Sequence, residues 1–439
     1  MPGHLGELTG QVPIELVDDV LAQARRGEHR VRRLPSRVVV YLLLAGALFA
    51  DLGWQQVWAR LVAGLPGTFT TPSRAGIAQA LRRVGPEPLV RLFDVLKGPG
   101  ATTANIRFAG LLPVAIDGTQ VFVADAEANL VRYAKHVSGP NGASGYPVAR
   151  LVALVSCGTR HLIDAVFAPA SVSETALAPQ LCRALTPSML LLGDRNFPSA
   201  TFLAQVHATG AKLLMRIKDG QRSARLPVLT RLADGTWLST HGTTTVRVIQ
   251  ARVRMRTEAG TTSGTYRLVT TLLDPDTAPA MTLVRLYHQR WEIETAFCEL
   301  KSTILHGRVL RARTPAGITQ EIYALLIAYQ ALRTAMTDAT NHDPHLPPDR
   351  ASFTIALAAA RDQITAATTA INATTIDLLG KIGAAVLNDR LPARRPRTNA
   401  RIVKRAMSKY NAKGRDRDRR TYRAQITIEL DPLTPTPDP

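Results

Sequence analysis

The spacing of hydrophobic residues changes once along the first half of the chain. Up to about residue 100 they recur every three or four positions, in stretches broken by Pro and Gly, which predicts helices. From Leu111 onward they form short apolar runs bounded by turn residues, which predicts strands. The expected order is three strands, a helix, a strand, a helix and a strand. We therefore expect a mixed α/β core in which helices cover a central sheet.

Two aspartates follow apolar runs in this region. LLPVAIDGT is expected to end as a strand at Asp117, and MLLLGD at Asp194. A carboxylate at such a position would be exposed at a sheet edge on a rigid backbone. Each aspartate alone also has a plainer explanation, with Asp117 in an Asp-Gly turn and Asp194 as a helix cap. A third acid, Asp164 in LIDAVFA, lies inside a predicted strand, which favours an ion-paired or edge role.

The segment YHQRWEIETAFCELK predicts an amphipathic helix with a narrow polar stripe beside an apolar one. At a helical step of about 100° per residue, the polar stripe holds Tyr287, Arg290, Glu294 and Lys301, and the apolar stripe holds Leu286, Ile293, Phe297, Leu300 and Ile304. Glu292 and Glu299 point away from the polar stripe, so the geometry singles out Glu294. An ordinary surface helix with an ion pair between Arg290 and Glu294 would also give this pattern.

Two further regions carry hydrophobic patterns of their own. In the helical N-terminal region, Ser73 is a candidate N-cap of a short helix carrying Arg82 and Arg83, followed by a Gly-Pro break and another helix. This pair either docks in a DNA groove or is a plain helical hairpin. Between Lys218 and Thr270 the alternation predicts a small β-rich unit. Its Trp237 either stacks on a displaced base or, more simply, packs in the core.

Composition and charge narrow the class of partner. The 439 residues suffice for two or three domains, and a net charge of +20 with a pI near 10.6 indicates a polyanionic partner, most often nucleic acid. Ten histidines and three cysteines show no metal-ligand spacing, so a disulfide framework or a structural zinc site is not expected. The longest apolar run, residues 38–50, is too short to cross a bilayer.

Helices are expected at 320–336 and in the Ala-rich region 351–387. Residues 390–423 hold fourteen Lys and Arg against two Asp, a tail suited to non-specific phosphate contacts.

The spacing Tyr, two residues, Arg, three residues, Glu, six residues, Lys resembles the signature of the IS4 family of DDE transposases. All four positions match, the following GRVLRARTPAGITQEIYALLIAYQALR is also similar, and two acidic motifs lie upstream in the right order. The resemblance extends from about Leu34 to about Tyr410. It implies a helical N-terminal DNA-binding domain (1–100), a ribonuclease H-like catalytic domain with a β-rich insertion at about 218–270 (101–345) and a helical, basic C-terminal region (346–439). In such a core the first and fourth strands are adjacent, so Asp117 and Asp194 would be neighbours.

The resemblance also implies a chemistry and a set of partners. Asp117, Asp194 and Glu294 would bind two Mg²⁺ ions, which Mn²⁺ can replace, for cut-and-paste cleavage and strand transfer of DNA. Phosphate contacts are expected from Arg290, Lys301 and Tyr287, and more weakly from Arg195. The partners would be the terminal inverted repeats, target DNA and a second protomer, in the cytoplasm of a bacterium at the nucleoid and without a membrane. A DNA hairpin intermediate is a further expectation.

Three other functions fit part of this pattern. The first is an inactive transposase relic that only binds DNA. The second is a two-carboxylate glycosidase, which the charge and the low aromatic content of 5% disfavour. The third is a general metal-dependent nuclease, which would cut without requiring a specific end sequence.

Overall fold

The computed structural model describes most of the chain, namely residues 3–28, 30, 32–100, 106–137, 143–218, 226–343, 346–367, 380–392, 397–399, 402–403, 411–412, 418 and 420–431. Contacts divide the chain into two compact units, neither of them continuous in sequence. The first comprises residues 1–192, 209–211 and 289–391, and the second comprises residues 193–208, 212–288 and 392–439. Among the described residues, no helix is both long and apolar enough to span a membrane.

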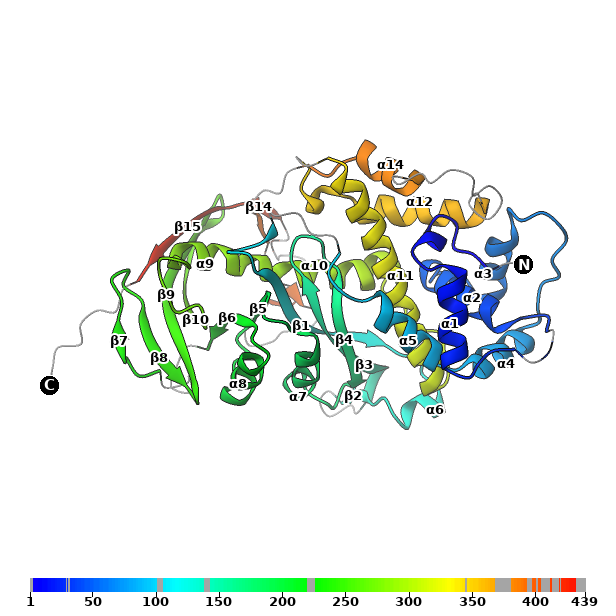
Figure 1. The fold of residues 1–439 in the computed structure, drawn as a ribbon, viewed down its shortest axis with the longest axis horizontal. Helices are drawn as coiled ribbons and strands as arrows, with labels where there is room; N and C mark the ends of the chain where they lie inside the picture. Colours follow the sequence, from blue (N-terminus) through cyan, green and yellow to red (C-terminus); the bar gives the residue numbers. More distant parts are fainter. Residues whose placement is uncertain are drawn as a thin grey trace. The chain divides into compact units, whose positions relative to one another are not determined.

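Helices from both ends of the first unit's sequence pack together. The N-terminal helices are α1 (Ile14–Gln23), α2 (Ser36–Leu48), α3 (Trp54–Val62), α4 (Arg74–Val84) and α5 (Glu87–Leu96). The longest helix, α11 (Pro315–Asn341), contacts α2 and α5, and it is joined by α12 (Phe353–Ala366) and α14 (Gly380–Asn388) (Figure 1). The apolar run that is too short for a bilayer forms α2, whose side chains are almost all buried. The helical prediction for the N-terminal region is therefore confirmed.

The first unit also holds a sheet in the order β2-β3-β1-β5, with β4 pairing the same strand β3. Its strands are β1 (Leu112–Phe122), β2 (Lys135–Val137), β3 (Ala143–Ser156), β4 (Leu162–Pro169) and β5 (Met189–Gly193), whose last residue is assigned to the second unit. Short helices α6 (Glu127–Leu130) and α7 (Glu174–Leu177) and the 3-10 helix η3 (Ala178–Ala184) connect them. Strands β1 and β5 are neighbours, as the ribonuclease H-like order requires, so the predicted α/β fold class is confirmed.

The predicted end of the first strand at Asp117 is wrong. Strand β1 continues to Phe122, and Asp117 lies opposite Ala153 in the middle of its antiparallel pairing with β3. What changes at Asp117 is burial, because residues 112–116 are buried and residues 117–120 are partly exposed. The Asp-Gly pair is therefore not a turn, and QVFVAD is not a separate strand. Asp194, in contrast, directly follows the end of β5, as predicted.

The segment predicted as one regular helix is made of four pieces. The α-helix α9 (Ala280–Tyr287) is followed by the 3-10 turn η4 (His288–Trp291), the α-helix α10 (Glu292–Cys298) and the π-helix η5 (Glu299–Ile304). The wider turn is visible where the Leu305 N–H donates to the Leu300 carbonyl, five residues back. A constant step of 100° therefore fails at both ends of α10. The apolar stripe is nevertheless buried at all five of its positions.

The second unit is built on a sheet in the order β6-β10-β9-β8-β7, and β15 also pairs with β9. Its elements are α8 (Ala200–Ala208), β6 (Lys212–Ile217), β7 (Thr230–Arg231), β8 (Trp237–His241), β9 (Thr244–Thr257), β10 (Gly260–Thr270), α9 and β15 (Gln425–Leu430). The strands expected at 218–270 are thus present, but they do not form a separate unit, because β10 pairs directly with β6. Trp237 is packed, with 3% of its surface exposed.

The basic C-terminal region lies largely outside the described residues. Its described parts include the short strands β11 (Arg397–Asn399), β12 (Ile402–Val403), β13 (Asn411–Ala412) and β14 (Thr421–Arg423). β11 pairs with β14, and β12 pairs with β13. The predicted domain boundaries at about residues 100 and 345 stay a prediction.

Candidate active site

Two of the three predicted carboxylates converge on one guanidinium in the first unit. Arg290 Nη1 lies 3.6 Å from Asp117 Oδ2, and Arg290 Nη2 donates to Glu294 Oε1 at 3.2 Å. Asp117 Oδ1 also accepts the N–H of Gly118 at 2.8 Å, which fixes the orientation of the carboxyl group on β1. The Arg290 side chain is 10% exposed, whereas that of Glu294 is 41% exposed. The site is therefore a half-open acidic pair with a buried cation between its members.

A lysine from the π-helix reaches the same strand. Lys301 Nζ donates to Thr119 Oγ1 at 3.1 Å. Thr119 is two residues beyond Asp117, so both side chains point to the same face of β1. Burial lowers the pKa of the Lys301 ammonium below its usual value. Sequence reasoning missed Thr119, although the period of two in a strand could have revealed it once β1 was known to continue.

The opposite face of β1 carries a further acid. A Cβ placed on Gly118 would lie 2.5 Å from the Glu174 carboxyl carbon, so the α7 side chain packs directly on this backbone. A larger residue at this position would have to displace the Glu174 side chain. Asp164, in contrast, is fully buried and ion-paired with Lys97 and Arg183, as its position inside a strand predicted.

The remaining predicted residues belong to the second unit. The Asp194 carboxylate accepts the backbone N–H of Asn196 at 2.8 Å and the Asn196 side chain at 3.3 Å. Tyr287 donates its hydroxyl to the Gly193 carbonyl at 3.2 Å, next to Asp194 in the chain. Arg195 is exposed. The structure therefore groups Asp117, Arg290 and Glu294 within one unit, and it links Tyr287 to the backbone beside Asp194 within the other.

The carboxylates fit a divalent cation by their chemistry. Asp117 and Glu294 offer hard oxygen ligands, the type that Mg²⁺ and Mn²⁺ prefer, and both already face one positive charge. Within the described part of the chain, no three His, Cys, Asp or Glu side chains are gathered into a ready metal site. The type of donor atom in Asp117 and Glu294 therefore suits such an ion.

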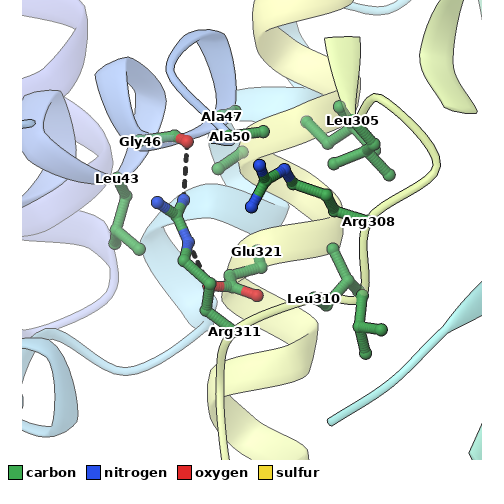
Figure 2. Close-up of a pocket in the computed structure, with 12 residues that line it drawn as sticks. Leu43, Gly46, Ala47, Ala50, Leu305, Arg308, Leu310, Arg311 and Glu321 are labelled. Carbon is green, nitrogen blue, oxygen red and sulfur yellow. Dashed lines mark hydrogen bonds and ion pairs between the residues drawn. The ribbon is translucent and has the colours of Figure 1, made fainter. Parts of the chain in front are cut away.

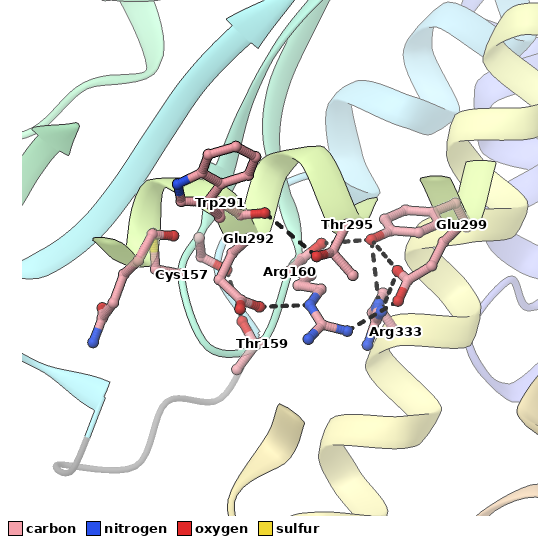
Figure 3. A network of polar contacts seen from close by, with 11 residues as sticks. Cys157, Thr159, Arg160, Trp291, Glu292, Thr295, Glu299 and Arg333 are labelled. Carbon is pink, nitrogen blue, oxygen red and sulfur yellow. Dashed lines mark hydrogen bonds and ion pairs between the residues drawn. The ribbon is translucent and has the colours of Figure 1, made fainter. Parts of the chain in front are cut away.

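The two other glutamates of this segment are buried away from the acidic pair. Arg160, in the turn between β3 and β4, donates to Glu292 and to Glu299, and Arg333 of α11 contacts Glu299 (Figure 3). Sequence reasoning placed Glu292 and Glu299 off the polar stripe but did not find their partners. The partners lie more than 130 residues upstream or 30 residues downstream, where helix periodicity gives no signal.

The predicted N-terminal pair of helices makes contacts within the first unit. Ser73 caps α4 as predicted, accepting the Gly76 N–H, and Arg82 is exposed while Arg83 contacts the Leu34 carbonyl and Glu28. Of the two paired arginines, only Arg82 is thus turned to solvent.

Figure 2 shows a small pocket beside Arg311, whose guanidinium donates to the carbonyls of Gly46 and Leu52 and to Glu321. Burial raises the pKa of Glu321, and Arg311 opposes this effect. Arg311 therefore joins the segment that follows the π-helix to the N-terminal helices.

Comparison with known proteins agrees with this architecture. Residues 2–94 match the model of the insertion element 4 transposase N-terminal domain, and residues 109–331 match that of the transposase DDE domain. The transposase InsG for insertion sequence element IS4 of Escherichia coli (strain K12) is 26% identical over 90% of this chain and 91% of its own length.

Two further similarities accompany these matches. The putative transposase InsZ of the same strain is 28% identical over 48% of this chain and 70% of its own length. The piggyBac transposase in a synaptic complex with hairpin DNA aligns with 89% of this chain and 84% of its own, at 12% identity and a TM-score of 0.42. With both family models matched in order, and the DDE model covering half of the sequence, the chain belongs to the IS4 family of DDE transposases.

Proposed function

We propose that this DNA transposase excises and inserts an insertion sequence by a metal-dependent cut-and-paste reaction at the terminal inverted repeats of that element. The observation that carries the proposal is the convergence of Asp117 and Glu294 on Arg290. The neighbouring position of β5, whose end is followed by Asp194, supports Asp194 as the third carboxylate. An inactive relic is not favoured, because all three acids and the four spaced residues are present.

The three carboxylates would hold divalent cations, for which we propose Mg²⁺ with Mn²⁺ as a substitute. Such ions, held by these carboxylates, would supply the positive charge that activates an attacking oxygen and stabilises the leaving one. Asp117 is suited to this role because β1 and its contact with Gly118 hold the carboxyl group rigidly. Glu294 is suited because its exposed side chain leaves room for a DNA phosphate.

The cationic and hydroxyl side chains of the signature would bind the DNA backbone. Arg290 and Lys301 approach β1 from the helical segment and supply positive charge beside the carboxylates. Tyr287 would position the protein main chain next to Asp194 through its contact with Gly193. Exposed Arg195 would add a contact to a DNA phosphate. The nucleic-acid partners are the two element ends and the target duplex.

Two protomers and a bacterial nucleoid setting are further parts of this proposal. Two element ends must be cut and joined together, which two copies of the active site would accomplish. The net charge of +20 supports the association with DNA.

The test is cleavage of labelled duplex DNA that carries the element's own end, with Mg²⁺ or with EDTA. We expect cutting at the repeat boundary with Mg²⁺ only, and a loss of at least about 100-fold in Glu294→Gln with end binding retained. Glu127→Gln, at an exposed glutamate of the same unit, is the matched control and should cut at the wild-type rate.

Two outcomes would contradict the proposal. End binding without cutting under any divalent ion would identify a DNA-binding relic. Equal cutting of DNA with and without the terminal repeat would identify a general nuclease.

A further inference from the structure

One arginine holds both glutamates that flank Glu294. Arg160 is 2% exposed, its Nε donates to Glu292 Oε2 at 2.5 Å, and its Nη1 donates to Glu299 Oε1 at 2.9 Å. Figure 3 shows its guanidinium between the two carboxylates. Because Glu292 is the first residue of α10 and Glu299 the first of η5, Arg160 holds both ends of the short helix that carries Glu294.

A second arginine fastens the same segment to the longest helix. Arg333 of α11 contacts the other oxygen of Glu299, and the Tyr329 hydroxyl lies 3.0 Å from that oxygen and 3.1 Å from the Arg160 carbonyl. We call Arg160, Arg333, Glu292, Glu299 and Tyr329 the arginine clamp. Its two guanidinium groups balance its two carboxylates, so every charge in the clamp has a partner of opposite sign.

Stability alone does not account for such a clamp. Apolar side chains of the same volume often stabilise a core as well as a buried ion pair does, because removing charges from water is costly. A guanidinium in addition fixes the geometry of the contact, since its planar fork donates hydrogen bonds to carboxylates only in defined directions. Glu292 and Glu299 are seven residues apart, so their backbones are separated by about 10 Å along a helix, and their contacts with one guanidinium fix both the rotation and the axial position of that helix.

We propose that Arg160 is a positioning residue for DNA cleavage, setting the rotation of α10 through Glu292 and Glu299 so that Glu294 meets Arg290 beside Asp117. This role rests on the proposed function. The side-chain contacts of Arg160 are with Glu292 and Glu299, and not with Asp117 or Glu294. A rotation of α10 of a few tens of degrees would move the Glu294 carboxylate by more than 1 Å, and misplacements of about 1 Å can cost about 100-fold in rate.

The experiment compares Arg160→Lys and Glu292→Gln with the wild-type chain. Lysine keeps the charge but lacks the fork, and glutamine keeps the shape of Glu292 while losing its charge. The measurements are the melting temperature, the dissociation constant for end DNA, and the single-turnover cleavage rate per folded molecule well below the melting temperature. Arg247→Lys is the matched control, because Arg247 is also fully buried and forks between a carboxylate and a carbonyl in the second unit.

We expect cleavage to fall by roughly 10- to 100-fold in both variants, with the dissociation constant within about twofold of wild type. A variant with both substitutions should cleave only slightly more slowly than the slower of the two single variants, because both changes act on the contact between Arg160 and Glu292. In Arg247→Lys the melting temperature should fall while the cleavage rate per folded molecule is retained.

Three results would overturn the positioning role. An unchanged cleavage rate in Arg160→Lys with a lower melting temperature would make the clamp a stabilising network only. Equal losses of binding and cutting would point to an effect on DNA affinity. A wild-type chain that binds its end but never cuts would remove the proposed function and the positioning role with it.

Discussion

Three glutamates within eight residues have different fates because of what each one meets. Glu292 and Glu299 meet buried guanidinium groups and are enclosed, whereas Glu294 meets Arg290 at a position where its own side chain stays 41% exposed. A buried carboxylate that is already ion-paired has little capacity left for a metal or a substrate. Among the three, Glu294 alone combines exposure with a facing aspartate.

The burial of His161 predicts how the stability of the protein depends on pH. Burial, assisted by the charge of Arg333, lowers the pKa of His161 to about 3. In the unfolded chain its pKa returns to about 6.5, so between these values the unfolded state takes up a proton that the folded state does not. Stability should therefore fall as the pH falls from about 6.5 towards 3, by up to about 1.4 kcal/mol per pH unit.

The test of this linkage is the urea midpoint of wild type and His161→Gln at pH 7 and pH 5. The wild type should lose about 2 kcal/mol more than the variant over this range. His207→Gln, at an exposed histidine, should behave as wild type. An identical pH dependence in wild type and His161→Gln would show that this histidine titrates normally.

At the scale of elements, the sequence predicted what depends on local periodicity. The helical N-terminal region, the N-cap at Ser73 and the buried stripe from Leu286 to Ile304 all follow from spacing within a few residues. The end of β1 was misplaced because a change from buried to exposed residues looks like a strand end, while the pairing partner Ala153 that continues the strand is distant in sequence.

The departures from a regular helix could not be predicted from the sequence either. Neither η4 nor η5 has a distinct residue pattern, and η5 makes tertiary contacts through Glu299 and Lys301 that the local sequence does not reveal. Glu294 was predicted from the signature and Asp117 from the end of an apolar run, whereas the clamp behind them joins residues that are far apart in sequence.

A close helix crossing gives an element-scale prediction. A Cβ on Gly46 of α2 would lie 2.4 Å from the Trp54 ring, which in turn packs against Arg311. Gly46→Ala should therefore destabilise the first unit by about 1–3 kcal/mol through overpacking, despite the better helix propensity of alanine. Thermal unfolding measures the loss. Gly76→Ala is the control, since the nearest atom there is the Ser73 hydroxyl at 3.2 Å. A Gly46→Ala variant that is more stable than the wild type would show that α2 and α3 can move apart without a cost in free energy.

At the scale of the whole molecule, the last described strand completes a sheet that begins in the middle of the chain. Strand β15 pairs with residues 251–256 of β9, and ion pairs join Arg252 to Asp431 and Arg254 to Glu429. Without β15, the backbone of this part of β9 would become an open edge beside Val253 and Met255. Open, partly apolar edges favour pairing with other chains.

Truncation before Gln425 should therefore increase self-association relative to the full chain. Light scattering after size-exclusion chromatography, at several protein concentrations, measures the change. Truncation after Asp431 removes only residues 432–439 and keeps β15, so it should behave as the full chain does. Equal behaviour of both truncations would show that β15 does not protect the edge.

The interleaving of the two units has a consequence for biosynthesis. A ribosome releases β9 long before β15, and the N-terminal helices long before α11, so neither unit can close while its early part is alone outside the tunnel. At about 5–20 residues per second, β9 waits on the order of ten seconds for its last neighbour. During this interval a newly made polypeptide exposes unpaired strand and apolar helix surface, which makes it a natural client for chaperones.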